Sequence, residues 1–304
     1  MSSNLAVLYD IPGPKARRRN LILTIVFLIL LAAGLWWVYA KLDAKGQFDW
    51  KLWKPIFQAN TWTTYLLPGL WNTIKAALIS VVIALPIGAL LGVARLSDHR
   101  WVRWVASVIV EFFRAIPVII LMVFAYTLWF TVFGSSSPLA SVVIGLVLYN
   151  GSVLAEVFRA GIQSLPKGQT EASMAIGLSK SQMMGQILLP QALTAMLPAV
   201  VSQLVVILKD TALGGLLLMG YNELRRAANT AGTNLKDQLQ MYVLIAVVYI
   251  VLNLLLTSTA SLLEKRLRRG KRGPRELAVM MTGAEAGGGP SMVVTDEQGN
   301  QTIA

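Results

Sequence analysis

The chain has 304 residues, of which 55% are hydrophobic and only 14% are charged, and its mean hydropathy is +0.60. Because a soluble protein carries about 25% charged residues, this composition favours membrane spans over a soluble core. The lack of cysteine excludes disulfides, thiol catalysis and cysteine-bound metal, and a single histidine, His99, argues against a histidine-based metal site.

Six membrane spans are predicted from runs of sequence without charge. They are residues 21–40, about 66–94, two spans within 115–155 that GSSSP at 134–138 separates, 181–208 and 238–263. About 20 apolar residues are enough to cross a bilayer as a helix. The expected fold is therefore an all-α membrane protein with about six transmembrane helices.

Two apolar segments need separate interpretations. Residues 21–40 follow the basic sequence KARRR, but they are too long for a signal peptide and no A-x-A site follows, so we expect a retained anchor helix. Residues 211–222 are apolar but too short to cross a bilayer, and we expect a helix break at Ala212–Gly215 and a re-entrant or interfacial piece.

The basic residues orient the chain. Six spans place both termini on one side, and the segments on that side hold 16 Lys and Arg against 8 on the other. The positive-inside rule therefore predicts that both termini are cytoplasmic. The basic residues that produce the net charge of +12 lie next to apolar spans, so a lipid bilayer, and no nucleic acid, is the expected partner.

The expected domain organisation follows from these runs. It comprises a cytoplasmic basic tail (1–20), an extra N-terminal transmembrane helix (21–40), an external linker (41–64), a core domain (65–265) and a cytoplasmic tail (266–304). The last of these is rich in Gly and poor in apolar residues, so we expect it to be disordered.

One predicted cytoplasmic loop, residues 161–190, is much longer than a connection between two spans requires. Its pattern indicates two short helical pieces separated near Gly177. Small residues at 172, 173, 175 and 177 would let another protein approach closely. On composition alone, an amphipathic helix that touches only lipid is an equally good interpretation.

The loop contains Glu171, Ala172 and Ser173, then Gly177, and then the sequence ILLP that ends at Pro190. In these residues and their spacing, the loop resembles the EAA loop of ABC importer permeases. Ser173 departs from the family pattern, which has alanine there. The resemblance implies that residues 166–190, with Gly168 and Gln169 among them, are coupling helices that seat in a separate ATPase subunit.

Further segments are similar to the polar amino acid class of this family. They are EVFRAGIQSLPKGQ (156–169), FRAIP (113–117, with Ala-Ile where the class has Gly-Thr) and KDTAL (209–213). The resemblance covers about residues 65–265 and is greatest to actinobacterial glutamate-uptake permeases. It implies a permease in the bacterial plasma membrane that takes up a polar amino acid, with glutamate favoured.

The resemblance also implies partners. They are an ABC ATPase dimer, a second permease chain that is the same or related, and an extracytoplasmic substrate-binding protein. The chain itself has no phosphate-binding loop, since its one Gly-Lys pair, Gly270-Lys271, lacks the preceding glycine and the following Ser or Thr. We expect no catalytic residue, cofactor or metal.

Charged residues within or beside spans are candidates for the substrate path. Arg114 and Glu156 belong to two i,i+3 pairs, Glu111/Arg114 and Glu156/Arg159, each of which could neutralise itself on one helix face. A purely structural ion pair is the alternative interpretation. Arg95 and Arg103 are interpreted as solvated or lipid-facing.

Lys209, Asp210 and Thr211 form the second group of path candidates. Before a broken helix, they could hold the ammonium and carboxylate of an amino acid. A water-satisfied pair at the outer interface is an equally good interpretation. Asn72, Asn150 and Gln203 are interpreted as hydrogen-bond partners between helices.

Two other classes of function are considered. An intramembrane enzyme would need a nucleophile with a base or a metal cluster, and no span holds histidine or cysteine. A self-contained secondary amino acid transporter remains the alternative, although it would predict more spans, internal repeats and no EAA-like loop.

Overall fold

The computed structural model describes residues 13–218, 220–269, 293–295 and 301–303, and the side chains of 217 and of 263–269 are not among the described parts. The chain divides into two compact units, residues 1–65 with 228–244 and residues 66–227 with 245–304. Helices α11 (Leu224–Leu235) and α12 (Gln238–Arg269) each contribute residues to both units.

The first unit begins with α1 (Pro14–Ala44), none of whose residues is buried. The short helices α2 (Trp50–Trp53), η2 (Lys54–Phe57), α3 (Ala59–Thr61) and η3 (Trp62–Leu66) follow. Of the predicted linker 41–64, residues 41–44 therefore belong to α1 and most of residues 50–64 form these short helices. The side-chain amide of Gln240 donates to the backbone oxygen of Gln47 (2.8 Å), which fixes this segment to the start of α12.

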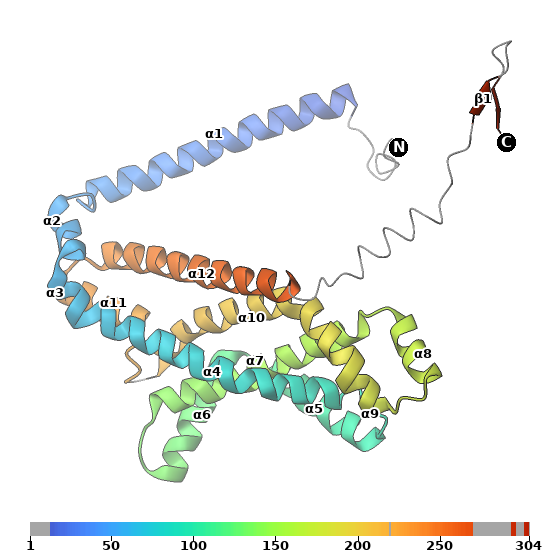
Figure 1. Ribbon diagram of the computed structural model, residues 1–304. Coiled ribbons are helices and arrows are strands. Elements are labelled where there is room, and N and C mark those ends of the chain that lie inside the picture. Colours follow the sequence, from blue (N-terminus) through green and yellow to red (C-terminus); the bar gives the residue numbers. More distant parts are fainter. Residues whose placement is uncertain (1–12, 219, 270–292, 296–300, 304) are drawn as a thin grey trace. The chain divides into compact units, whose positions relative to one another are not determined.

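The second unit is a helix bundle around α7 (Pro138–Gln163). Helix α7 contacts α4 (Leu67–Ala94), α5 (Arg100–Ala115), α6 (Val118–Phe133) and α10 (Leu189–Leu217) (Figure 1). Small residues let α4 and α7 approach closely, because a Cβ atom on Gly88 would lie 2.6 Å from the Cβ of Leu154. The apolar core of this unit consists of two clusters, and α7 contributes buried residues to both.

The predicted spans are confirmed in number and kind. Among the described residues, five helices are long and apolar enough to cross a membrane, or six if the bent pair α5–α6 counts as one span. Helix α4 contains Pro86 without a break, as membrane helices tolerate. Helix α6 ends at Gly134, whose φ of 66° provides the predicted turn after the third span.

The third predicted span, 115–133, begins at a bend. Its residues 118–133 form one helix, α6, as expected, but α6 meets α5, a helix that the sequence analysis did not predict, at 101° around Ile116 and Pro117. Pro117 cannot donate a backbone hydrogen bond and forces the residue before it out of the α region, so Ile116 is extended, with ψ of 131°.

Two short strands, β1 (Val293–Thr295) and β2 (Gln301–Ile303), pair antiparallel with Val293 opposite Ile303. They lie in the tail for which the sequence predicts disorder, and that expectation stays a prediction. The remaining residues after 269 lie outside the described parts.

Candidate functional site

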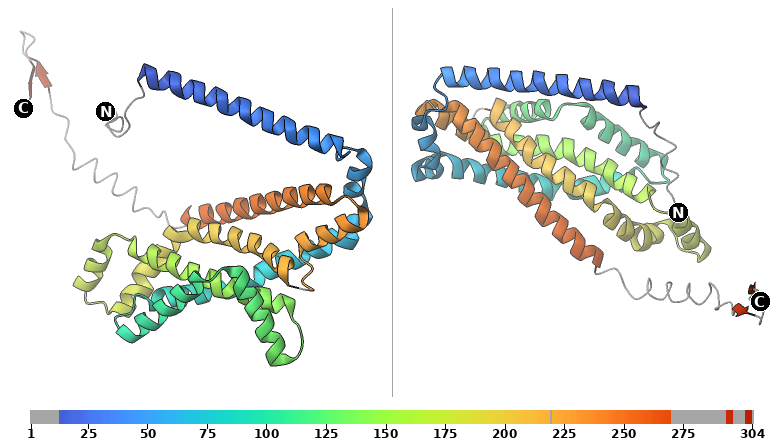
Figure 2. Two further views of the ribbon diagram at one scale, coloured as in Figure 1. Left: turned by 180° about the vertical axis from the view of Figure 1, so that it is seen from behind. Right: turned by 90° about the horizontal axis from the view of Figure 1, so that it is seen from above.

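The 166–190 segment forms two helical pieces joined by a tight turn. Helix α8 (Lys167–Ala175) is followed by Gly177, then by α9 (Lys180–Gln182) and the π-helical turn η4 (Met183–Leu188), which continues into α10. Gly177 has a φ of +78°, a conformation that favours glycine. The two pieces and their separation at Gly177 agree with the prediction, and Figure 2 shows them together at one end of the second unit.

Only part of this segment faces the solvent. The predicted residues Gly168, Gln169, Glu171, Ala172 and Gly177 are exposed, Pro190 is half-buried and Ser173 is buried. The Ser173 hydroxyl donates to the backbone oxygen of Gln169 (2.6 Å), so this small side chain packs within the segment rather than on its outer surface.

Two apolar side chains directly before the turn at Gly177 are exposed. Met174 is 57% exposed and Ile176 is 75% exposed. The sequence analysis did not single them out, although apolar residues beside a predicted turn glycine could have indicated them. Exposed apolar side chains at the tip of a rigid segment are typical of a surface that another protein covers.

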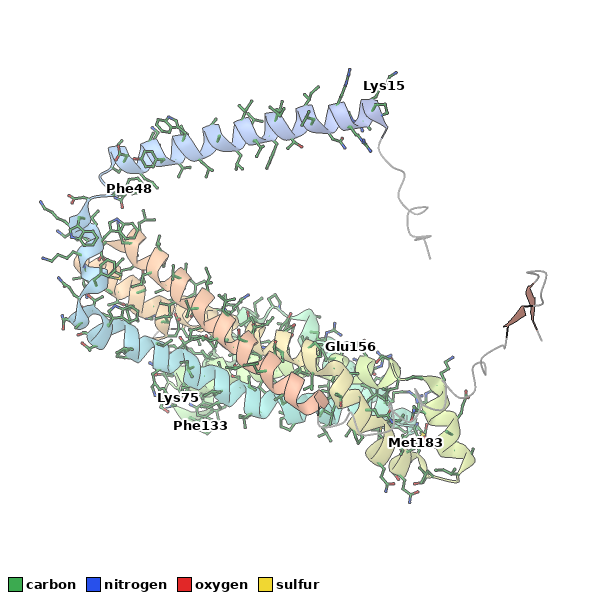
Figure 3. All side chains as sticks on the ribbon, turned by 45° about the horizontal axis from the view of Figure 1, so that its top comes forward. Lys15, Phe48, Lys75, Phe133, Glu156 and Met183 are labelled. Atoms are coloured by element: carbon green, nitrogen blue, oxygen red, sulfur yellow. The ribbon has the colours of Figure 1, made fainter. Side chains whose placement is uncertain are left out.

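The base of the segment is held to the bundle. Met183 and Leu188 are buried in the core cluster that includes Phe158 of α7. Met183 is labelled in Figure 3. The Gln191 side chain donates to that of Gln169 (3.1 Å), which joins the start of α8 to the start of α10. A displacement of the tip would therefore be passed to α7 and α10.

A cluster of five charged side chains joins α4, α5 and α7. Glu156 of α7 accepts from Arg95 at the end of α4 (2.6 Å) and from Arg159 (2.9 Å), and it lies 3.6 Å from Arg114 of α5. Arg95 also pairs with Glu111 of α5 (3.3 Å). The cluster therefore combines three arginines with two glutamates.

This cluster corrects two interpretations. Glu156 and Arg159 pair as predicted, but Glu111 pairs with Arg95 and Arg114 with Glu156, so Glu111/Arg114 is not a self-neutralising pair. Arg95 is buried, with 8% of its side chain exposed, and is neither solvated nor lipid-facing. Its partners lie 16 and 61 residues away, and no local pattern could have identified them.

The second group of path candidates lies on a continuous helix. Helix α10 passes through Lys209, Asp210 and Thr211 and ends at Leu217, so the predicted break at Ala212–Gly215 is wrong. The glycines serve close packing instead, because a Cβ on Gly214 would lie 2.4 Å from Val142 and one on Gly215 would lie 1.9 Å from Glu223. Thr211 is buried and donates to its own helix, at the Leu208 oxygen (2.7 Å).

Among the described residues, no hydrogen bond or ion pair joins the two groups of path candidates. Arg114 and Glu156 belong to the charged cluster, whereas Lys209 is exposed and Asp210 is half-buried on α10. Asn150 and Gln203 are hydrogen-bonded between α7 and α10, as predicted. Asn72 of α4 donates to the backbone of Asn222 (2.8 Å).

Glu223, which the sequence analysis did not select, is fully buried before α11. Its carboxylate accepts from the backbone N–H groups of Arg225 (2.6 Å) and Arg226 (2.8 Å) and from the Tyr249 hydroxyl (3.2 Å). Burial raises the pKa of Glu223, and these hydrogen bonds partly oppose the effect. The residue caps α11 and joins it to α12 within the second unit.

A bundle of helices long and apolar enough to cross a membrane, with one two-part segment at its end, defines the class of multi-pass membrane proteins. Residues 84–269 match the family described as "Binding-protein-dependent transport system inner membrane component". The chain belongs to this family, and the ABC importer permease that the motifs predict is confirmed.

Individual relatives of the chain are permease proteins of the same kind. The chain is 48% identical to the glutamate transport system permease protein GluD of Corynebacterium glutamicum, over 76% of this chain and 85% of the relative. It is 33% identical to the glutamate/aspartate import permease protein GltK of Escherichia coli, over 73% and 98%. A crystal structure of an amino acid ABC transporter with histidines matches with a TM-score of 0.62 at 28% identity, covering 67% of this chain and 95% of that chain.

Proposed function

We propose that this chain is the permease of an ATP-driven importer of glutamate. The names of GluD and GltK support this substrate, as does the 30% identity to a glutamate/glutamine/aspartate/asparagine permease protein of Rhodobacter capsulatus. Charge does not decide the substrate, because Arg114, Arg159 and Lys209 are balanced by Glu111, Glu156 and Asp210.

The observation that carries the proposal is the form of the 166–190 segment. Its two helical pieces, fixed at their base and exposed at the Met174–Gly177 tip, suit insertion into a groove of another protein. We propose that this protein is an ABC ATPase and that Gly168, Gln169, Glu171, Ala172, Ser173, Gly177 and Pro190 shape the contact. Of these, Ser173 acts from inside by holding α8 together.

The remaining partners follow from the same proposal. Two ATPases act as a dimer, so two permease chains are required, and an external binding protein delivers the substrate. The excess of basic residues on one side supports a cytoplasmic location for both termini and for the 166–190 segment. The predicted boundaries of the domains, with the core at 65–265, are part of this proposal.

The test is uptake and ATP hydrolysis in proteoliposomes that hold this chain, its ATPase and its binding protein. Glu171→Lys and Gly177→Arg are compared with wild type, and Lys51→Glu, an exposed charge reversal outside the segment, serves as the control. We expect glutamate-stimulated hydrolysis and uptake in wild type and the control, and loss of both in the two segment variants at normal insertion. Competition among unlabelled amino acids then identifies the substrate.

Two results would contradict the proposal. Uptake without any ATPase would show a self-contained secondary transporter. Segment variants that match wild type would show that residues 166–190 do not couple the chain to an ATPase.

A further inference from the structure

Residues 95–99, here called the α4–α5 corner, contact both the 166–190 segment and the charged cluster. We propose that this corner is a second route by which movement of the segment reaches the membrane helices, and that Arg95 and Asp98 are its positioning residues. The inference rests on the proposed coupling to an ATPase. It concerns a route separate from the direct continuation of the segment into α7 and α10.

The first link joins the corner to the segment. Lys180, at the start of α9, forms an ion pair with Asp98, 82 residues earlier in the chain. Beside this pair lies an open pocket of about 400 Å³, whose lining includes Leu96, Asp98, Lys180 and Met184. Leu96 of the corner and Met184 of the segment both pack against the apolar cluster that includes Met183. Among the described residues, the ion pair adds a polar connection between the same two elements.

The corner itself is stiffened by hydrogen bonds. The backbone N–H of Ser97 donates to the Ala94 oxygen (3.1 Å), which continues the last turn of α4. The Arg103 guanidinium donates to the Ser97 oxygen (2.9 Å), which fixes the corner to the first turn of α5. A displacement of Asp98 would therefore move the end of α4 and the start of α5 together.

The second link joins the corner to the bundle. Arg95 donates to Glu156 of α7 and Glu111 of α5, and its side chain is almost completely buried. A guanidinium can hold two carboxylates in fixed directions because its donors lie in one plane, which a lysine ammonium cannot do. Arg95 therefore sets the position of α5 relative to α7.

The consequence concerns the bent pair α5–α6. Helix α5 contacts α4 and α7 and continues, through the 101° bend at Pro117, into α6. Neither helix is continuous with the 166–190 segment. Through the α4–α5 corner, a movement of the 166–190 segment can reach helices α5 and α6.

The test measures ATP hydrolysed per glutamate transported, in the reconstituted transporter and normalised to assembled complex. The variants are Asp98→Lys, Lys180→Asp, both reversals together, Arg95→Gln and Arg95→Lys. Arg100→Gln is the matched control, because Arg100 is a neighbouring arginine with no ion pair among the described residues.

We expect each single reversal to raise the ratio about twofold to fivefold, the factor that corresponds to the loss of one exposed ion pair. The double reversal should return the ratio to near the wild-type value, which a general loss of structure would not produce. Arg95→Gln should raise the ratio further, and Arg95→Lys should restore it only in part, because lysine keeps the charge but not the planar fork.

A crosslink provides an independent measurement. The chain has no cysteine, so Asp98→Cys with Lys180→Cys can be joined selectively by a flexible bis-maleimide. If the corner and the segment move together, uptake persists after crosslinking. Uptake that stops on crosslinking would overturn the proposal, because the two elements would then have to separate during transport.

The outcomes separate this proposal from the function on which it rests. If Glu171→Lys abolishes uptake while every corner variant matches Arg100→Gln, the second route is wrong and the coupling function stands. If Glu171→Lys and Gly177→Arg also match wild type, the coupling function itself fails.

Discussion

At the scale of single residues, close packing explains why some glycines that suggest a helix break lie within a continuous helix. Gly214 and Gly215 look like a helix break, but α10 continues through them because neighbouring side chains occupy the space of their missing Cβ atoms. The carboxylate of Glu223 lies against Gly215 and caps α11.

Gly215→Ala is expected to destabilise the protein. The added methyl would displace the Glu223 carboxylate, and such overpacking costs about 1–3 kcal/mol. Thermal unfolding in detergent measures the effect, with Gly34→Ala as the control because no atom lies within 4 Å of its added Cβ. Equal melting temperatures for the two variants would show that the position of the Glu223 carboxylate does not require a glycine at 215.

Asn150 and Gln203 are expected to stabilise each other. Replacing either one by leucine leaves a buried amide without its partner, whereas replacing both removes the unpaired group. A double-mutant cycle on unfolding should give a coupling free energy of about 0.6–2 kcal/mol. A coupling near zero would mean that the hydrogen bond between α7 and α10 contributes nothing measurable.

At the scale of elements, the 166–190 segment was predictable because its signals are local. Gly177 marks a turn, the run from Glu171 to Pro190 carries the family spacing, and both pieces are helical as expected. The bend between α5 and α6 was missed, although Pro117 is visible in the sequence, because a proline can either kink a helix slightly or end it.

The tip of the segment is expected to provide apolar contact with the ATPase. Met174→Asp with Ile176→Asp should weaken binding of the solubilised permease to its ATPase at least about tenfold, which corresponds to about 1.4 kcal/mol. The unfolding temperature of the permease should not change, since both side chains are exposed.

Phe57→Asp is the matched control for that experiment, because Phe57 is 70% exposed but lies on η2, outside the segment. Undiminished binding by the Met174/Ile176 variant would place the contact elsewhere on the segment.

At the scale of the whole molecule, the family match covers residues 84–269 and leaves α1 outside. No residue of α1 is buried, which suits a helix surrounded by lipid. The part of the chain that the transport function requires is therefore expected to begin after it.

Removal of residues 1–44 is expected to leave ATP-dependent uptake within about twofold of wild type, because the loss of an exposed helix removes no core contacts. Uptake per assembled complex in proteoliposomes measures this. A large fall at normal assembly would instead assign α1 a role in ordering the complex.

The sequence by itself determined the spans, the turns at Gly134 and Gly177, and the family, because charge-free runs, turn glycines and motif spacing are properties of neighbouring residues. Only the tertiary structure decided which charges meet. Arg95 pairs with residues 16 and 61 positions away, and Lys180 pairs with a residue 82 positions away. Such partners depend on how α4, α5, α7 and the 166–190 segment pack, and no local pattern records that packing.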